Sequence, residues 1–398
     1  MASVMSEIGD LRARPGAAPR ADAGPGQARP EPRAGRLGAG AWAAAEAADP
    51  AGTAPPVSVI MPVRDEERHL AEAVRHVLGQ EYDGELELVI AVGPSRDRTE
   101  EIARRLAERD GRIIVVANPS GQRPDGLNAA VRASRHGIVV RVDGHALLPP
   151  GYIATAVRTL RETGAVNVGG IMAAEGITPF QRAVAWAMTS PAGVGAARFH
   201  TGGSPGPADT VYLGAFRREA IEAVGGYDER YERAEDWEMN HRIRERGGLI
   251  WFQPEMRVTY RPRATVAALA EQYFHYGRWR RVVARQHAGT INLRYLAPPA
   301  AVAAIAAGTV AGAVGVSAQA AGAGGWWPGL LTAGLVIPVA YLAGVLAVTA
   351  TAVRALRGRA LAWLPVVLAT MHACWGAGFL TSPRRLAPAA RERPGQRS

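Results

Sequence analysis

The chain has 398 residues and a formal net charge of +10, and its basic side chains are all arginine because the sequence contains no lysine. This length is enough for two or three domains and for the core of an enzyme. The absence of lysine excludes a Walker-type phosphate loop and a lysine Schiff base, and the single cysteine, Cys374, excludes intramolecular disulfides and cysteine-rich metal sites.

Many arginines lie in the N-terminal tail and beside the apolar C-terminal third. Residues 1–54 are rich in Ala, Gly, Pro and Arg, and we predict that this tail is disordered because it has few large apolar side chains to bury. No apolar core follows the early charges as it would in a signal peptide, so the next domain is expected to be cytoplasmic. The arginines beside the apolar third favour anionic lipid over nucleic acid as a partner.

From residue 55 the apolar pattern alternates between strands and helices. The first strand is predicted to end at Pro62, ahead of a polar corner at 64–67, and Asp97 or Thr99 is predicted to cap the second helix. Four strands separated by helices predict a parallel sheet with right-handed crossovers, half of a nucleotide-binding fold. No G-x-G-x-x-G follows the first strand, which counts against a dinucleotide cofactor. The predicted strands are 57–61, 86–92, 113–116 and 138–142, with helices near 70–78, 99–110 and from about 125.

The fourth strand ends in the sequence R-V-D-G-H, which places Asp143 and His145 at a strand's carboxyl end. Open α/β sheets bind their ligands at this edge. A carboxylate and an imidazole two residues apart can share one divalent cation, and this donor set suits Mn²⁺ or Mg²⁺. The alternative is a turn in which Asp143 and Gly144 serve only the backbone geometry and His145 is incidental.

The second half of the domain has a looser pattern. A helix that begins with Glu235, Asp236 and Trp237 carries apolar Met239 and Ile243 before it ends near Gly247. A strand pair is expected within 249–260. The other predicted elements are a helix at 153–163, strands at 166–172 and 211–216, and a helix at 218–224.

The C-terminal third contains a long uncharged run. Residues 295–353 contain no Asp, Glu, Arg or His. Because one span needs about 20 apolar residues, two transmembrane helices fit here with 321–328 as their turn. The positive-inside rule puts both outer ends in the cytoplasm, because they are flanked by arginines: Arg285, Arg294, Arg354, Arg357 and Arg359. A buried, alanine-rich soluble hairpin is the alternative.

Two neighbouring segments complete this region. Residues 360–383 are long enough to cross the membrane again, but crossing would export the basic tail at 384–398, so two or three transmembrane helices are expected within 295–383. Residues 266–283 mix aromatic and arginine side chains, which is typical of an interfacial helix, and we assign 263–294 to interfacial amphipathic helices. The catalytic domain then covers 55–262.

Five short motifs together resemble the family 2 glycosyltransferases, in particular the membrane-attached branch of the succinoglycan and exopolysaccharide biosynthesis type. The resemblance covers roughly residues 55–285, and its motifs are V-S-V-I-M-P-V-R-D-E-E, L-N-A-A-V, R-V-D-G-H-A, G-A-F-R-R-E with V-G-G-Y-D-E, and E-D-W. It implies a GT-A-type nucleotide-sugar-binding fold, an α/β Rossmann-like mixed sheet followed by C-terminal transmembrane helices. It also implies a metal-dependent, inverting hexosyltransferase that moves a sugar from a nucleoside-diphosphate donor to a hydroxyl of a lipid-linked or glycan acceptor.

The resemblance also implies roles for individual residues. The departing diphosphate needs its charge neutralised, which a metal held by Asp143 and His145 would do. The acceptor hydroxyl must lose a proton, and Asp236 matches the family's catalytic base. Without the family pattern, Asp236 would be read as a helix-terminal acid favoured by the dipole. The expected substrate-binding residues are Pro62, Val63, Arg64, Glu66, Asp97, Asn128, Asp143, Glu235, Trp237, Arg278 and Trp279.

The sequence departs from the family at two places. Where the family has D-D-G-S-T-D-G-T, this chain has V-G-P-S-R-D-R-T at 92–99, so the acids that contact the base are missing and a uridine preference does not follow. The Q-x-x-R-W signature is widened to Gln272, Arg278 and Trp279, which favours single additions over polymerisation. The alternatives are a catalytically silent membrane scaffold of the same fold and a sugar nucleotidyltransferase, although the latter usually has an early Gly-rich loop and a lysine.

Overall fold

The computed structural model describes residues 54–195 and 197–386. The predicted disordered tail therefore lies outside the described residues except for Ala54, and of the basic tail only Arg384–Leu386 is described, as the short helix η4.

The first half of the catalytic domain is a parallel sheet, as predicted. Strand β1 (Val57–Val63) lies between β2 (Leu86–Val92) and β4 (Ile138–Arg141), and β3 (Ile113–Ala117) pairs with β2. The connecting helices are α2 (Leu70–Leu78), α3 (Thr99–Arg109) and α4 (Arg123–Ala133). Since all four strands are parallel, their carboxyl ends meet at one edge of the sheet.

The second half extends this sheet with mixed pairing. Within the described residues the sheet has eight strands in the order β3-β2-β1-β4-β7-β5-β8-β6. Strand β7 (Tyr212–Arg217) is antiparallel to both β4 and β5 (Asn167–Ala174), whereas β8 (Ile250–Tyr260) is parallel to β5 and antiparallel to β6 (Gly206–Pro207). The predicted Rossmann-like mixed sheet is thus confirmed.

Helices cover both faces of the sheet. Residues of α2, α3 and α5 (Tyr152–Thr163) share one apolar cluster with the sheet. Residues of α4, α9 (Arg218–Ala223) and α10 (Glu235–Glu245) share a second cluster with its other face. Each helix is amphipathic and buries one apolar stripe, as Leu70, Ala73, Val74 and Val77 do in α2.

Two expected boundaries are wrong. The first strand continues through Pro62 to Val63. Pro62 is tolerated because the pairing of β1 with β4 ends at Ile60 and Arg141, so this ladder does not require an N–H group from residue 62. The strand pair expected within 249–260 is one strand, β8, whose register against β5 shifts between Gly169 and Ile171. The turn-like Pro254 lies in this bulge.

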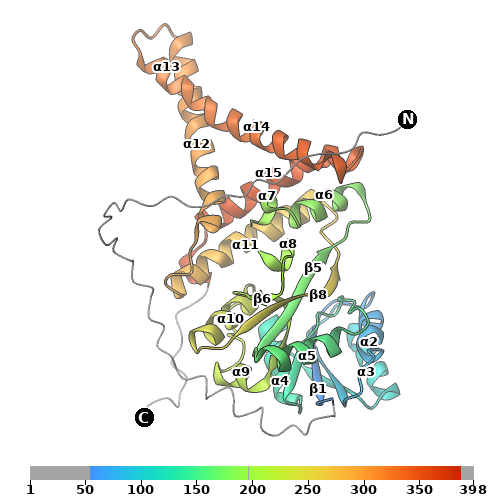
Figure 1. The fold of residues 1–398 in the computed structure, drawn as a ribbon. Helices are drawn as coiled ribbons and strands as arrows, with labels where there is room; N and C mark the ends of the chain where they lie inside the picture. Colours follow the sequence, from blue (N-terminus) through green and yellow to red (C-terminus); the bar gives the residue numbers. More distant parts are fainter. Residues whose placement is uncertain (1–53, 196, 387–398) are drawn as a thin grey trace, which may run out of the picture. The chain divides into compact units, whose positions relative to one another are not determined.

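The C-terminal third forms long helices, shown in orange and red in Figure 1. The described residues contain three helical segments that are long and apolar enough to cross a membrane, Leu293–Ala320, Trp327–Arg354 and Arg359–Leu380. The first is α12, the second comprises α13 (Trp327–Thr332), η2 (Ala333–Leu335), α14 (Val336–Thr351) and η3 (Ala352–Arg354), and the third is α15 (Arg359–Leu380). The turn expected at 321–328 separates the first two.

The first two of these segments pack closely through glycines. A side chain at Gly308 would lie 2.6 Å from the carbonyl oxygen of Gly334, and one at Gly312 would lie 2.3 Å from Leu335. This G-x-x-x-G spacing lets two helix backbones approach, which is how apolar helices associate in lipid.

A single helix, α11 (Val266–Gln286), covers most of the segment assigned to interfacial helices. Its residues Leu269 and Tyr273 share an apolar cluster with α6 (Pro179–Met188), α14 and α15. Figure 1 shows α11 and α15 side by side, next to the sheet domain.

Candidate active site

A buried arginine lies at the centre of the polar cluster at the strand ends. Arg141 is the last residue of β4 and is 2% exposed. Its guanidinium lies 3.1 Å from Asp143 and 3.4 Å from Glu235, and it also pairs with Asp236. Because buried charges need partners, this arginine ties the D-G-H turn to the E-D-W helix across the sheet.

The same cluster includes a second arginine. Arg123, the first residue of α4, lies 3.2 Å from Glu235. Glu235 is therefore held between two guanidinium groups, and its side chain is 4% exposed. The two arginines together offset part of the negative charge of Asp143, Glu235 and Asp236.

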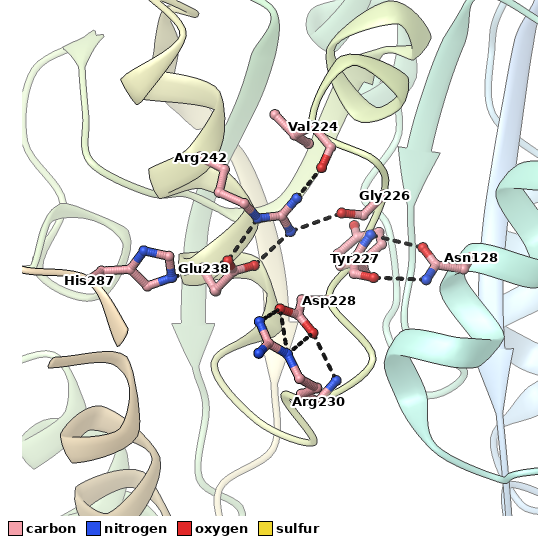
Figure 2. Close-up of polar contacts among 9 residues, drawn as sticks. All are labelled: Asn128, Val224, Gly226, Tyr227, Asp228, Arg230, Glu238, Arg242 and His287. Carbon is pink, nitrogen blue, oxygen red and sulfur yellow. Dashed lines mark hydrogen bonds and ion pairs between the residues drawn. The ribbon is translucent and has the colours of Figure 1, made fainter. Parts of the chain in front are cut away.

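A polar network fixes the loop that leads into α10 (Figure 2). The side-chain amide of Asn128 donates to the carbonyl of Tyr227 and accepts from its N–H, both at 2.8 Å. Further along α10, Arg242 pairs with Glu238 and donates to the carbonyl oxygens of Val224 and Gly226. The first residues of the loop, 224–227, are thus held by side chains that bind their backbone groups.

The helix α10 begins abruptly. Ala234, the residue before Glu235, has φ 64°, a left-handed conformation that a β-carbon disfavours. Asp65, which directly precedes Glu66, has φ 54°. Such strain is typical of sites where the surrounding structure holds functional side chains in place.

The carboxylate of Asp143 is kept ionised. Although burial opposes its charge, the guanidinium groups of Arg141 and Arg123 lower the pKa of Asp143 to about 2. His145 is two residues further along the chain, and its Nδ1 is 2.7 Å from Oε1 of Glu66. The hydrogen bond to Glu66 raises the pKa of His145 above its usual value.

This donor set fits a divalent cation. An ionised carboxylate and an imidazole oriented by a second carboxylate are groups that would hold such a cation, and the bond between Nδ1 of His145 and Glu66 leaves Nε2 as the nitrogen that would ligate it. The turn packs tightly on the end of β1, since a β-carbon at Gly144 would lie 2.8 Å from Cγ1 of Val63. Only glycine fits this close approach.

The polar corner that carries Glu66 is held by the loop after β2. Asp97 accepts from the N–H of Glu67 at 3.0 Å and from the N–H of Thr99 at 3.0 Å, while Thr99 accepts from the N–H of Glu66 at 2.7 Å. Asp97 or Thr99 was expected to cap α3, but the N-cap residue is Arg98, which makes no side-chain capping bond. Asp97 and Thr99 instead connect α3 to the corner.

Asp236 is the accessible acid of its pair. Its side chain is 33% exposed, whereas that of Glu235 is 4% exposed. Partial burial raises the pKa of Asp236 to about 6, helped by the negative charges of Glu235 and Asp143 and opposed by Arg141. A carboxyl with such a pKa can accept a proton near neutral pH.

Comparison with known proteins gives the chain a family. The model of glycosyl transferase family 2 matches residues 58–225. The succinoglycan biosynthesis protein ExoA of Rhizobium meliloti is 34% identical over 254 residues, which are 63% of this chain and 77% of that protein. The chain belongs to glycosyltransferase family 2.

Two further relatives are more distant. An undecaprenyl-phosphate 4-deoxy-4-formamido-L-arabinose transferase of Pseudomonas aeruginosa is 32% identical over 121 residues, 29% of this glycosyltransferase and 35% of the relative. A mannosyltransferase of Pyrobaculum calidifontis, solved with GDP-Man and Mn²⁺, has a TM-score of 0.50 at 20% identity and covers 84% of this chain and 90% of its own. The latter likeness supports the GT-A-type fold expected from the sequence.

The remaining predicted site residues of this glycosyltransferase lie in two places. Pro62 and Val63 end β1 beside the D-G-H turn, and Arg64 lies 3.8 Å from Asp65 at the surface of the corner. In α11, the guanidinium of Arg278 lies over the ring of Phe274, and Trp279 is 2% exposed with its ring centroid 6.0 Å from that of Tyr231.

These placements change how several residues are interpreted. Trp279 belongs to an apolar cluster with Tyr231, Val282 and Val283, so it supports the domain from within. Asn128 contacts the loop before α10, and Asp97 contacts the corner. Trp237 stacks on His241 and lies under Arg280, 4.2 Å from the ring centroid, which links α10 to α11.

Sequence reasoning missed Arg141 and Arg123. A signal for Arg141 was present, because an arginine in the V-V-R-V-D strand interrupts an otherwise apolar run, and fully buried arginines require anionic partners. Nothing local marks Arg123, whose partner Glu235 is 112 residues away.

Proposed function

We propose that the protein is an inverting glycosyltransferase that moves a sugar from a nucleoside-diphosphate donor to a hydroxyl of a lipid-linked or polysaccharide acceptor at the cytoplasmic face of the membrane. The observation that carries this proposal is Arg141, which joins Asp143 of the D-G-H turn to Asp236 of the E-D-W helix in a member of family 2. The groups needed for leaving-group stabilisation and for proton removal thus share one site.

The donor side is formed by Asp143 and His145, which would hold a divalent cation. When bound, Mn²⁺ or Mg²⁺ would neutralise the negative charge that develops on the departing diphosphate. Asp143 is kept ionised by Arg141 and Arg123, and Glu66 orients His145. The mannosyltransferase of similar fold was solved with GDP-Man and Mn²⁺, which supports this donor class.

The acceptor side is formed by Asp236. Its partly exposed carboxylate would take the proton of the attacking hydroxyl, while the buried Glu235 keeps Arg123 and Arg141 in position. In a single in-line displacement the acceptor oxygen forms its bond to the sugar carbon on the side opposite the departing diphosphate, which gives inversion, and the base takes the hydroxyl proton on the acceptor's side. Asp143 and Asp236 pair with different nitrogens of the Arg141 guanidinium, which supports separate roles for the two acids.

The nature of the acceptor rests on the apolar helices. Three candidate spans follow the catalytic domain and α11 in the described residues, and one relative is named for transfer to undecaprenyl phosphate. An acceptor anchored in lipid would approach the site from the membrane, so we assign the acceptor to lipid-linked sugars or a growing polysaccharide.

The test separates chemistry from binding with two substitutions. Asp236→Asn keeps the shape but cannot accept a proton, so turnover at saturating substrates should fall about 10²–10⁴-fold while donor affinity stays within a few-fold of wild type. Asp143→Ala should instead weaken donor and Mn²⁺ binding first. The measurements are nucleotide release in a donor screen and donor affinity by calorimetry, both on full-length protein in nanodiscs.

Asp209→Asn is the matched control, because Asp209 is 66% exposed and pairs with Arg244 at 3.4 Å, away from Arg141. It should leave turnover unchanged. Turnover of Asp236→Asn within a few-fold of wild type would exclude Asp236 as the base. Absence of nucleotide release with every donor tested would instead favour the silent scaffold.

A further inference from the structure

The helix α15 contacts the catalytic domain along most of its length. Near its start, the ring of Trp363 packs edge-on against Phe180 of α6, with centroids 5.4 Å apart. At its middle, Nε2 of His372 lies 2.7 Å from the carbonyl oxygen of Ala192 in α7 (Pro191–Val194). After its end, Arg285 of α11 donates to the carbonyl oxygens of Ser382 and Pro383 at 2.8 and 3.2 Å. The helix therefore stays beside the domain from its first turn to its last.

The contact between α15 and α11 is close enough to exclude side chains. A β-carbon at Gly378 would lie 2.1 Å from the carbonyl oxygen of Phe274, and one at Gly277 would lie 2.0 Å from that of Trp375. A third of the most apolar window of α15 is buried, against 6% for the segment that contains α14. α15 is thus packed on protein to a much greater extent than α14.

The neighbouring α11 carries charges that a bilayer core does not accept. Along the stretch that faces α15 it contains Glu271, Arg278, Arg280, Arg281 and Arg285, and the guanidinium of Arg281 lies 4.9 Å from the ring centroid of Phe379. A charged residue at the centre of a membrane helix costs about 2.5–3.5 kcal/mol. If α15 crossed the membrane, these charges would be carried to the same depth.

Arginines flank α15 at both ends. Arg357 lies just before it and Arg359 is its first residue, while Arg384 and Arg385 follow it. A spanning helix would place one of these pairs outside the cell, whereas a helix lying along the inner surface would place both next to anionic headgroups.

The side of α15 that faces away from the domain is apolar. Its exposed residues recur at helical spacing, and the larger ones are Trp363, Val366 and Leu380, which are 36%, 42% and 51% exposed. They form one stripe along the helix.

We infer that α15 is an in-plane helix that seats the catalytic domain on the cytoplasmic leaflet, with its outer stripe in the boundary between headgroups and acyl chains, and that only α12 and the α13–α14 segment cross the bilayer. The helix is long enough to span, at about 33 Å for 22 residues, so its length does not decide the question. The packing of α15 on the charged helix α11 and the arginines at both of its ends favour the in-plane position. The inference rests on the membrane residence proposed above.

The test is labelling of single cysteines with a membrane-impermeant maleimide, in a Cys374→Ala background that removes the natural thiol. Ala323→Cys, in the turn between α12 and α13, should be labelled in intact spheroplasts. Ala389→Cys, after α15, should be labelled only after permeabilisation, like the cytoplasmic control Arg109→Cys at the exposed end of α3. Labelling of Ala389→Cys from outside would overturn the inference.

Failure to label Ala323→Cys from outside would contradict the membrane hairpin itself, and with it the inference. Donor turnover is measured on the same variants, so a failure of the proposed chemistry is distinguishable from a failure of the topology. Labelling does not require activity.

The depth of α15 gives an independent measurement. A fluorophore on Val366→Cys, Ala373→Cys or Leu380→Cys in anionic nanodiscs should be quenched equally by a headgroup quencher and weakly by a quencher near the chain ends. If Ala373→Cys is instead the deepest of the three, α15 spans and the inference is wrong. Gly378→Leu should weaken the packing of α15 on α11 and change these depths. Gly344→Leu should not, because a β-carbon at Gly344 meets no atom within 4 Å.

Discussion

At the level of single residues, the active site depends on the pairing of the buried Arg141 and the more exposed Arg123 with three carboxylates. Burial raises and Arg141 lowers the pKa of both Asp143 and Asp236. The two acids shift in opposite directions because Arg123 and His145 further lower the pKa of Asp143, whereas the charges of Glu235 and Asp143 raise that of Asp236. Environments that separate the pKa values of neighbouring acids are how one site performs both charge stabilisation and proton transfer.

This difference predicts an acid limb in the pH profile. Asp236 acts as a base only when ionised, so activity should rise with pH through its pKa of about 6 and fall about tenfold per unit below it. The measurement is kcat/KM for the acceptor between pH 4.5 and 8, which reports the free enzyme. An ordinary aspartate would keep its activity to about pH 4.

Asp236→Asn is the control for this assignment. The variant should retain low activity without the limb near pH 6. A limb that persists in the variant would belong to another group and contradict the assignment to Asp236.

At the level of elements, the positions of β4 and α10 determine how the acids of the active site lie relative to one another. These two elements are far apart in the chain, and the loop before α10 brings them together because Asn128 and Arg242 bind its backbone (Figure 2). The family motif that contains Asn128 thus acts on the site through α10.

Removing the hydrogen bonds between Asn128 and the loop should lower both stability and turnover. Asn128→Ala leaves the buried N–H and carbonyl of Tyr227 without their partner, which should lower the free energy of unfolding by about 1–3 kcal/mol and reduce turnover by displacing Asp236. Thermal melting in detergent, together with turnover, checks this result. Asn292→Ala, at an exposed helix start without a side-chain capping bond, should change stability by less than about 0.5 kcal/mol. Equal stability of the two variants would show that the Asn128 bridge contributes little.

At the level of the whole molecule, the catalytic domain and the candidate membrane helices share one core. Leu269 and Tyr273 of α11 pack with α6 and α15, and Trp279 packs on Tyr231. The domain boundary expected at 262 therefore passes between residues that bury each other.

This sharing predicts how truncations behave. Full-length protein should resist carbonate extraction, and a chain ending at Thr290, which keeps α11, should be released from membranes and show a cooperative melting transition. A chain ending at Arg261 should aggregate, because it lacks Trp279, Val282 and Val283, which cover Tyr231. A soluble, cooperatively melting 1–261 chain would contradict the shared core, and full-length protein released by carbonate would contradict membrane residence.

Several features of this protein follow from sequence patterns that extend over only a few residues. The parallel strands, the exit of Asp143 and His145 from β4, the opening of α10 at Glu235 and the uncharged apolar run follow from side-chain periodicity, turn residues and the cost of charge in lipid, all of which act over a few residues. Pro62 and β8 escaped this reasoning because a strand's tolerance for proline or a bulge depends on which neighbour it pairs with.

Contacts between residues that are far apart in the chain became known only from the tertiary structure. The pairing of Arg141 with Asp236, the burial of Trp279 and the position of α15 on α11 each join residues that are tens of residues or more apart in the chain. Arg278 and Trp279 were expected at the substrate, yet helical periodicity turns Trp279 into the domain. The physical reason is that a pattern states which face of an element is apolar, but the partner of that face is chosen by the packing of the whole chain.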